Sequence, residues 1–102
     1  MDRFEALNNI FANVEEDKKI LVAPLIEKVV YLENRLSRLE KYPFILYNKR
    51  TGESKSTGAY KQYKEVEQSY TNCLKILLSV LRNASVEKED AFDQWIRERQ
   101  NK

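Results

Sequence analysis

Apolar side chains recur every three or four residues through the first forty positions, which is the spacing of one face of a helix. The residues on this stripe are Phe4, Leu7, Phe11, Val14, Leu21, Leu25, Val29, Leu32, Leu36 and Leu39. Lys18 interrupts the stripe, and Pro24 lacks a backbone donor and disfavours helix at the residue before it. We therefore expect a first helix over residues 3–14 and a long second helix over 17–41, either kinked at Pro24 or beginning just before it.

Between Leu25 and Leu39 the apolar repeat of the second predicted helix is heptad, and its polar residues are expected on the other faces. Those polar residues are Glu27, Lys28, Glu33, Asn34, Arg35, Ser37 and Arg38. The repeat covers about two heptads, fewer than a coiled coil needs to be recognised. Packing within a helical bundle explains the pattern equally well.

A second apolar stripe predicts a third helix over residues 59–83. Its members are Tyr60, Tyr63, Val66, Tyr70, Cys73, Leu74, Leu77, Val80 and Leu81. Ile76 and Leu78 widen the apolar face towards its end, so that one partner helix would not cover it. We therefore expect part of this face to contact another subunit.

The segments that flank this helix carry turn and cap residues. Residues 42–58 are expected to form a loop, in which the apolar run Phe44-Ile45-Leu46-Tyr47 fits either a brief strand or an extended segment lying on the helices. Ser85 is a candidate N-cap for a fourth helix over 86–99, which has apolar positions at Phe92, Trp95 and Ile96. The sequence thus predicts a single all-α domain, residues 1–102, with two long antiparallel helices joined by a loop and short helices at both ends.

Charge is distributed unevenly along the chain. Residues 41–64 carry six basic residues and one acidic residue, a net charge of +5, whereas the rest of the chain has a net charge of −3. A basic patch of this kind attracts a phosphate backbone. The candidate nucleic-acid contacts are Lys49, Arg50, Lys55, Lys61 and Lys64. A solvated loop and a contact to an acidic protein remain alternatives.

The composition argues against catalysis. The chain has no histidine and one cysteine, so it lacks the commonest general base and cannot form a thiolate zinc cluster. Lys55-Ser56-Thr57 resembles the end of a phosphate-binding loop, but Gly52 and Gly58 do not have the spacing of that motif. The acidic runs at 15–17 and 87–90 are typical of helix starts. We therefore expect no enzyme, no metal and no cofactor.

The same composition suggests where the chain resides. Cys73 lies on an apolar helical stripe, which indicates a buried reduced thiol and a cytosolic setting. The N-terminus has charged residues and no apolar run, so no signal peptide is expected. No segment approaches the ~18 consecutive apolar residues of a membrane span, so no membrane contact is expected.

The order of these parts resembles a known family. The stretch "KKILVAPLIEKVVYLENRLSRLEKYPF" and, after a polar segment, "GAYKQYKEVEQSYTNCLKILLSVLRN" are similar to short phage proteins of the terminase small subunit family, over about residues 17–83. The family pattern is a "PLI…V…LE..L..L" helix, a variable loop, a "Y…Y…Y" helix and a leucine-rich end. The N-terminal helix-turn-helix of many members is not evident here.

The resemblance implies a helical, ring-forming, non-catalytic protein of the host cell cytoplasm. Such proteins recognise viral DNA and regulate the large terminase subunit, which carries the ATPase and the nuclease. Without a helix-turn-helix, contact with double-stranded DNA would not be sequence-specific through this chain alone. Assembly into a homo-oligomer would use the residues Leu25, Val29, Leu32, Leu36, Leu74, Leu77 and Leu81. The alternative is a structural or regulatory helical protein that oligomerises and binds another protein and not DNA.

Overall fold

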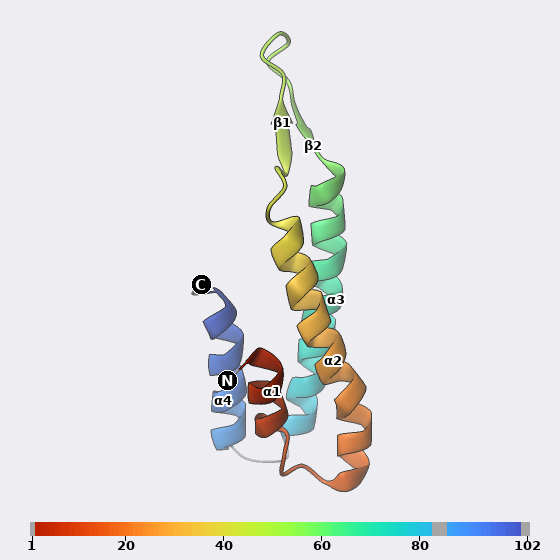
Figure 1. The fold of residues 1–102 in the computed structure, drawn as a ribbon, viewed down its shortest axis with the longest axis vertical. Coiled ribbons are helices and arrows are strands. Elements are labelled where there is room, and N and C mark those ends of the chain that lie inside the picture. Colours follow the sequence, from red (N-terminus) through yellow and green to blue (C-terminus); the bar gives the residue numbers. More distant parts are fainter. Residues whose placement is uncertain (1, 83–85, 101–102) are drawn as a thin grey trace.

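The computed structural model describes residues 2–82 and 86–100, which form four helices and one two-stranded sheet. The helices are α1 (Arg3–Ile10), α2 (Glu16–Leu39), α3 (Gly58–Leu81) and α4 (Val86–Gln100), and the strands are β1 (Ile45–Tyr47) and β2 (Ser54–Ser56). Helices α2 and α3 run antiparallel as a long stem, and the β-hairpin extends from one end of it (Figure 1). Helices α1 and α4 pack beside the other end, and the molecule measures 60 × 23 × 20 Å.

The predicted all-α architecture is confirmed in its main part, since the described chain is mostly helical. The segment predicted as a loop over 42–58 contains the hairpin, so the brief-strand alternative for the apolar run is correct. The other alternative, an extended segment lying on the helices, is wrong. Ile45, Leu46 and Tyr47 keep 64%, 59% and 64% of their surface exposed because the hairpin projects beyond the stem.

The predicted boundaries of the first two helices need correction. Helix α1 ends at Ile10 rather than near residue 14, and Asp2 caps its start by accepting a 2.7 Å hydrogen bond from the Glu5 amide. Helix α2 passes through Pro24 without interruption, so it does not begin just before that residue. The packing of α2 on α3 and α1 outweighs the single backbone hydrogen bond that a proline removes.

The core lies between α2 and α3. It continues to α1 and α4 at the end of the stem opposite the hairpin, which we call the body end. Its buried apolar residues are Leu7, Phe11, Val22, Ile26, Val29, Leu32, Leu36, Val66, Tyr70, Cys73, Leu77, Leu81, Phe92 and Trp95. The ring of Phe11 meets that of Phe92 edge to face, with 5.9 Å between centroids, which joins α1 to α4. The predicted buried thiol is confirmed, since Cys73 is a free, buried cysteine. The predicted N-cap Ser85 lies outside the described residues.

The apolar face of α2 differs from the predicted one at its start, while Val29, Leu32 and Leu36 are buried as predicted. Leu21 keeps 70% of its surface exposed, whereas Val22 and Ile26 keep only 1% and 2%. Glu33, expected on a polar face, is 96% buried, with 4% of its surface exposed. The buried residues of α2 are Val22, Ile26, Val29, Leu32, Glu33 and Leu36, so the predicted stripe is correct at Val29, Leu32 and Leu36 and wrong at Leu21.

The residues predicted to join copies of the chain pack inside one chain instead. Val29, Leu32, Leu36, Leu77 and Leu81 are buried where α2 meets α3, and they offer no surface to a second copy. The other two, Leu25 and Leu74, are partly buried against the same core.

Helix α4 covers part of the wide apolar face of α3. Leu74 and Leu78 of α3 and Ile96 of α4 line the same shallow hollow between these helices. Ile76 on the same helix keeps 50% of its surface exposed, so α4 covers this face only in part.

Candidate nucleic-acid interface

The β-hairpin has a defined register and a closed turn. The pairs are Ile45 with Ser56, Leu46 with Lys55, and Tyr47 with Ser54. At the turn, the Asn48 amide donates to the Glu53 carbonyl at 2.9 Å, and the Gly52 amide donates to the Asn48 carbonyl at 2.8 Å. Gly52 has a φ of 72°, in the left-handed region that glycine adopts most readily. The Asn48 side chain also accepts from the Arg50 amide at 2.9 Å, so the tip is held in one conformation.

The base of the hairpin is attached to the start of α3. The Thr57 hydroxyl donates to the Pro43 carbonyl at 2.8 Å and accepts from the Tyr60 amide at 3.2 Å, which caps α3. The Phe44 ring packs against Tyr60 and Tyr63, with centroid distances of 5.8 and 5.0 Å. These contacts fix the direction in which the arm leaves the stem. We call residues 44–57 the arm.

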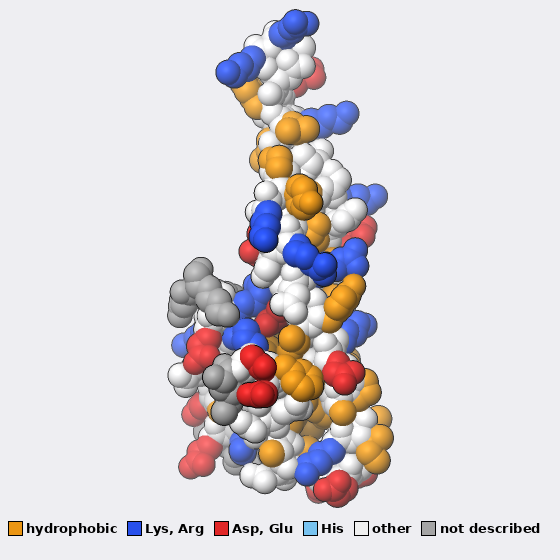
Figure 2. Space-filling model, viewed as in Figure 1, with side chains coloured by type: hydrophobic (Ala, Val, Ile, Leu, Met, Phe, Trp, Pro, Cys, Tyr) orange, Lys and Arg blue, Asp and Glu red, His pale blue; other side chains and the backbone are white. Residues whose placement is uncertain are grey.

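All five predicted nucleic-acid contacts lie at the arm end of the molecule. Lys49 and Arg50 lie in the turn, Lys55 lies on β2, and Lys61 and Lys64 lie in the first turns of α3, all of them exposed. Figure 2 shows basic side chains at the tip of the arm and along the stem below it. Lys64 also lies over the Tyr60 ring, at 5.2 Å from the centroid. The structure therefore brings the five together at one end, spread over the arm and its base.

These cations are not neutralised by the fold. Among residues 2–82 and 86–100, none of the five forms an ion pair, in contrast to Arg3, Lys19, Arg97 and Arg99. An exposed cation that is not held in an ion pair loses little when it contacts a phosphate, and it releases a counterion from the nucleic acid. The arm end therefore has the charge and accessibility of a phosphate-binding surface.

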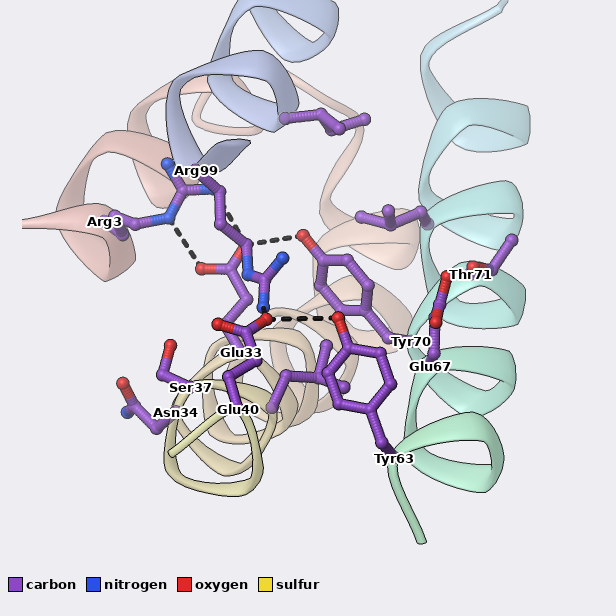
Figure 3. A pocket seen from close by; sticks show the side chains of 13 residues that line it. Arg3, Glu33, Asn34, Ser37, Glu40, Tyr63, Glu67, Tyr70, Thr71 and Arg99 are labelled. Atoms are coloured by element: carbon purple, nitrogen blue, oxygen red, sulfur yellow. Dashed lines mark hydrogen bonds and ion pairs between the residues drawn. The ribbon is translucent and has the colours of Figure 1, made fainter. Parts of the chain in front are cut away.

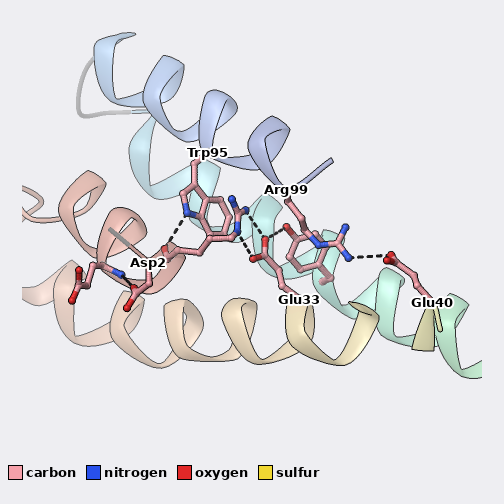
Figure 4. A network of polar contacts seen from close by, with 8 residues as sticks. Asp2, Glu33, Glu40, Trp95 and Arg99 are labelled. Carbon is pink, nitrogen blue, oxygen red and sulfur yellow. Dashed lines mark hydrogen bonds and ion pairs between the residues drawn. The ribbon is translucent and has the colours of Figure 1, made fainter. Parts of the chain in front are cut away.

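A buried polar cluster at the body end was not predicted from the sequence. The Arg3 guanidinium donates to both carboxylate oxygens of Glu33, at 2.6 and 2.8 Å, and the Tyr70 hydroxyl donates to the same carboxylate at 2.5 Å (Figure 4). The Arg3 guanidinium also lies 3.9 Å from the centroid of the Trp95 ring, whose indole N–H donates to the Arg3 carbonyl at 3.0 Å. We call these four residues the Glu33 cluster, and it joins all four helices.

One signal in the sequence marks this cluster. Glu33 lies four residues after Val29 and three before Leu36, which places a carboxylate on the buried face of α2. Such a group requires a cation and hydrogen-bond donors. The partners themselves, 30 and 37 residues away, are set by the tertiary fold.

A cavity of about 550 Å³ lies beside the cluster, between α2, α3 and the end of α4 (Figure 3). Its wall includes Arg99, which reaches the Glu40 carboxylate at 3.3 Å, and Tyr63, which donates to the same oxygen at 3.1 Å. The Arg99 Nε atom is buried and has no hydrogen-bond partner. The carboxylate of Glu33 is bound by Arg3 and Tyr70, and that of Glu40 by Arg99 and Tyr63. These hydrogen bonds in the cavity wall hold α1 and α4 against the stem. Within the described ranges, no group of three His, Cys, Asp or Glu side chains is placed to hold a metal.

The Tyr70 hydroxyl is expected to make stability depend on pH above pH 10. Burial, the hydrogen bond to Glu33 and the negative charge of that carboxylate raise the pKa of Tyr70. In the unfolded chain Tyr70 loses its proton near pH ~10, so above that pH the unfolded state binds fewer protons than the folded state. The free energy of unfolding should therefore fall by up to about 1.4 kcal/mol per pH unit from this group. Urea unfolding of wild type and Tyr70→Phe between pH 8 and 11.5 measures it.

The difference between the two proteins isolates this hydroxyl from the other groups that titrate at high pH. Tyr70→Phe should be less stable at pH 8 by about 1–3 kcal/mol, because it removes a buried hydrogen bond. Its stability should then decline less steeply than that of wild type. Parallel curves above pH 10 would contradict the expectation.

No protein-family model, curated protein or solved structure matches the chain. In the part of the chain that the structure describes, no helix is long and apolar enough to cross a membrane. The assignment of function therefore depends on the geometry of the arm and on the sequence resemblance.

Proposed function

We propose that this chain is a non-catalytic DNA-binding protein of phage genome packaging, with the role of a terminase small subunit. The observation that carries the proposal is the arm, on which exposed and unpaired basic residues project beyond a helical body. The packaging role comes from the resemblance of residues 17–83 to that family. The protein acts in the host cell cytoplasm, where the viral DNA and the large terminase subunit are available.

The charge distribution supports binding through the arm end. Residues 41–64 have a net charge of +5, and the rest of the chain has a net charge of −3. The acidic first turns of α2 and α4 contribute to that negative part. A polyanion is therefore attracted to the arm and repelled by the body, so that DNA approaches from one end.

Homo-oligomerisation and a contact with the large terminase subunit belong to the proposal as well. The buried interior of the stem is not accessible to another chain, so we assign these contacts to exposed apolar residues of α2. Ile20 and Leu21 on α2 keep 75% and 70% of their surface exposed, and Tyr31 farther along α2 keeps 53%. These side chains lie below the arm, so a protein bound there leaves the arm free.

The decisive experiment measures the salt dependence of duplex binding. If the five basic residues each contact a phosphate, log K should fall with log salt with a slope of about −4.5, a loss of about 500-fold between 50 and 200 mM salt. Replacing Lys49, Arg50 and Lys55 by glutamine leaves two contacts, so the slope should become about −1.8 and the loss about 12-fold. Fluorescence anisotropy with a labelled 20-bp duplex gives both values.

A matched variant controls for net charge. Lys28, Lys75 and Arg82 are exposed and lie away from the arm, so replacing them by glutamine removes the same three charges. That variant should keep the slope of wild type. Equal loss in both triple variants would show a general charge effect, and absence of duplex binding at 50 mM salt would overturn the proposed function.

The second candidate function is a helical regulatory protein that binds another protein and not DNA. The exposed apolar side chains of β1 favour it, because Ile45 and Tyr47 on one face of the hairpin and Leu46 on the other are all uncovered. The two candidates differ in the same experiment. Failure to bind duplex at low salt would leave the second one standing.

A further inference from the structure

The register of the hairpin separates its side chains into two chemically different faces. In an antiparallel pair, directly opposite residues lie on the same face, and successive residues alternate between faces. Ile45, Tyr47, Ser54 and Ser56 therefore share one face, which we call the neutral face, and Leu46 and Lys55 lie on the other. All six side chains are exposed.

The neutral face carries hydrogen-bonding groups without charge. The hydroxyls of Tyr47, Ser54 and Ser56 can each donate or accept, and Ile45 adds an apolar surface. The cations of the arm lie elsewhere, in the turn at Lys49 and Arg50 and on the opposite face at Lys55. Thus the arm combines an uncharged polar face with positive charge in the turn and on the opposite face.

We propose that the arm binds double-stranded DNA by placing the neutral face in the major groove. This inference rests on the proposed function and specifies its binding mode. A two-stranded ribbon fits the major groove, which is about 12 Å wide, and is too wide for a minor groove of about 6 Å. Hydroxyls accept or donate to either kind of base edge, and an aliphatic side chain suits the thymine methyl. Lys49 and Arg50 then lie near the phosphates that border the groove, which positions the ribbon without reading sequence. Lys55 lies on the face turned away from the groove, so four of the five cations remain as phosphate contacts and the salt slope expected for this binding mode is about −3.6.

The dimensions of the hairpin limit what it can read. Each strand has three residues, which at about 3.3 Å per residue span about three base pairs of a duplex. Because serine and tyrosine hydroxyls pair with several base edges, the arm should tolerate many sequences. The proposed contact is therefore groove-specific and only weakly sequence-specific.

The first test uses the wild-type chain with four DNA probes of one sequence at 50 mM salt. They are the plain 20-bp duplex, a duplex whose pyrimidines carry a bulky substituent at the 5-position, a duplex saturated with the minor-groove ligand netropsin, and the single strand. Blocking the major groove should weaken binding at least tenfold, whereas the minor-groove ligand should leave it unchanged within twofold. The single strand should bind more weakly than the plain duplex.

The second test compares variants on the two faces. Tyr47→Ala combined with Ser54→Ala should lower duplex affinity about tenfold without changing the salt slope, because no phosphate contact is lost. Leu46→Ala, a truncation of similar exposure on the other face, should bind like wild type. Tyr47→Phe keeps the aromatic ring in the strand and removes only the hydroxyl, so it separates a lost contact from a disturbed hairpin.

The outcomes separate this inference from the proposed function. Absence of binding to the plain duplex overturns both. The groove assignment is overturned if the 5-substituted duplex binds as tightly as the plain duplex, or if netropsin prevents binding. In either case the proposed DNA binding itself is retained. Tighter binding to the single strand also overturns the groove assignment, since the arm would then act as a stacking surface for unpaired bases.

Discussion

Replacing Trp95 by alanine is expected to lower the free energy of unfolding by about 4 kcal/mol, the largest loss from any single truncation that we consider. The indole is 97% buried, with 3% of its surface exposed, and it packs against Phe92 at a centroid distance of 6.1 Å. It also carries the Arg3 guanidinium on its face and donates to the Arg3 carbonyl. A domain of this size has a total stability of about 5–15 kcal/mol, so this loss takes the protein close to unfolding.

Urea unfolding followed by far-ultraviolet circular dichroism measures the effect, since the variant lacks the only tryptophan of the chain. Trp95→Phe retains an aromatic ring and should lose less stability than Trp95→Ala. Tyr42→Ala is a control at an exposed aromatic residue, which keeps 62% of its surface exposed, and should change stability by no more than about 0.5 kcal/mol. A loss below about 1 kcal/mol for Trp95→Ala would contradict the packing of α4 described here.

Replacing Arg3 by leucine is expected to cost about 3 kcal/mol, because it leaves the Glu33 carboxylate in the core without its cation. Tyr70 would still donate to that carboxylate, but one neutral donor compensates a buried charge only in part. The cation contact with the Trp95 ring is lost in the same variant. Urea unfolding at pH 7 measures the loss.

A double variant tests whether the cost comes from the unpaired carboxylate. Arg3→Leu combined with Glu33→Leu removes both charges, so it should be more stable than Arg3→Leu alone. The exposed ion pair of Arg97 with Asp93, at 2.9 Å, provides a matched control, and Arg97→Leu should change stability by less than about 1 kcal/mol. Equal losses for the double and single variants would refute the charge explanation.

The two long helices could be predicted because their apolar positions repeat at helical spacing over more than twenty residues. The buried face of α3 follows the predicted stripe through Val66, Tyr70, Cys73, Leu77 and Leu81. The stripe predicted for α2 is wrong at Leu21, because a residue either four or three positions before Leu25 fits helical spacing, and the buried one is Val22. Local spacing alone does not decide which of Leu21 and Val22 faces the core.

The arm was harder to predict because its stability does not come from burial. Each strand has only three residues, all exposed, so the usual alternation of apolar and polar positions is absent. What fixes the hairpin is turn chemistry at Asn48 and Gly52 and the cap at Thr57, which a sequence shows only as common loop residues. The basic residues of the arm could be predicted as exposed because a cluster of like charges stays in solvent whatever the tertiary contacts around it.

The contact between Trp95 and Arg3 joins residues that are 92 positions apart. The stem, by contrast, pairs helices that are neighbours in the chain, so it can form as soon as both are synthesised. Closing the longer loop costs more conformational entropy and takes more time. Helix α1 packs on both α2 and α4, so its docking surface is complete only once α4 lies beside it.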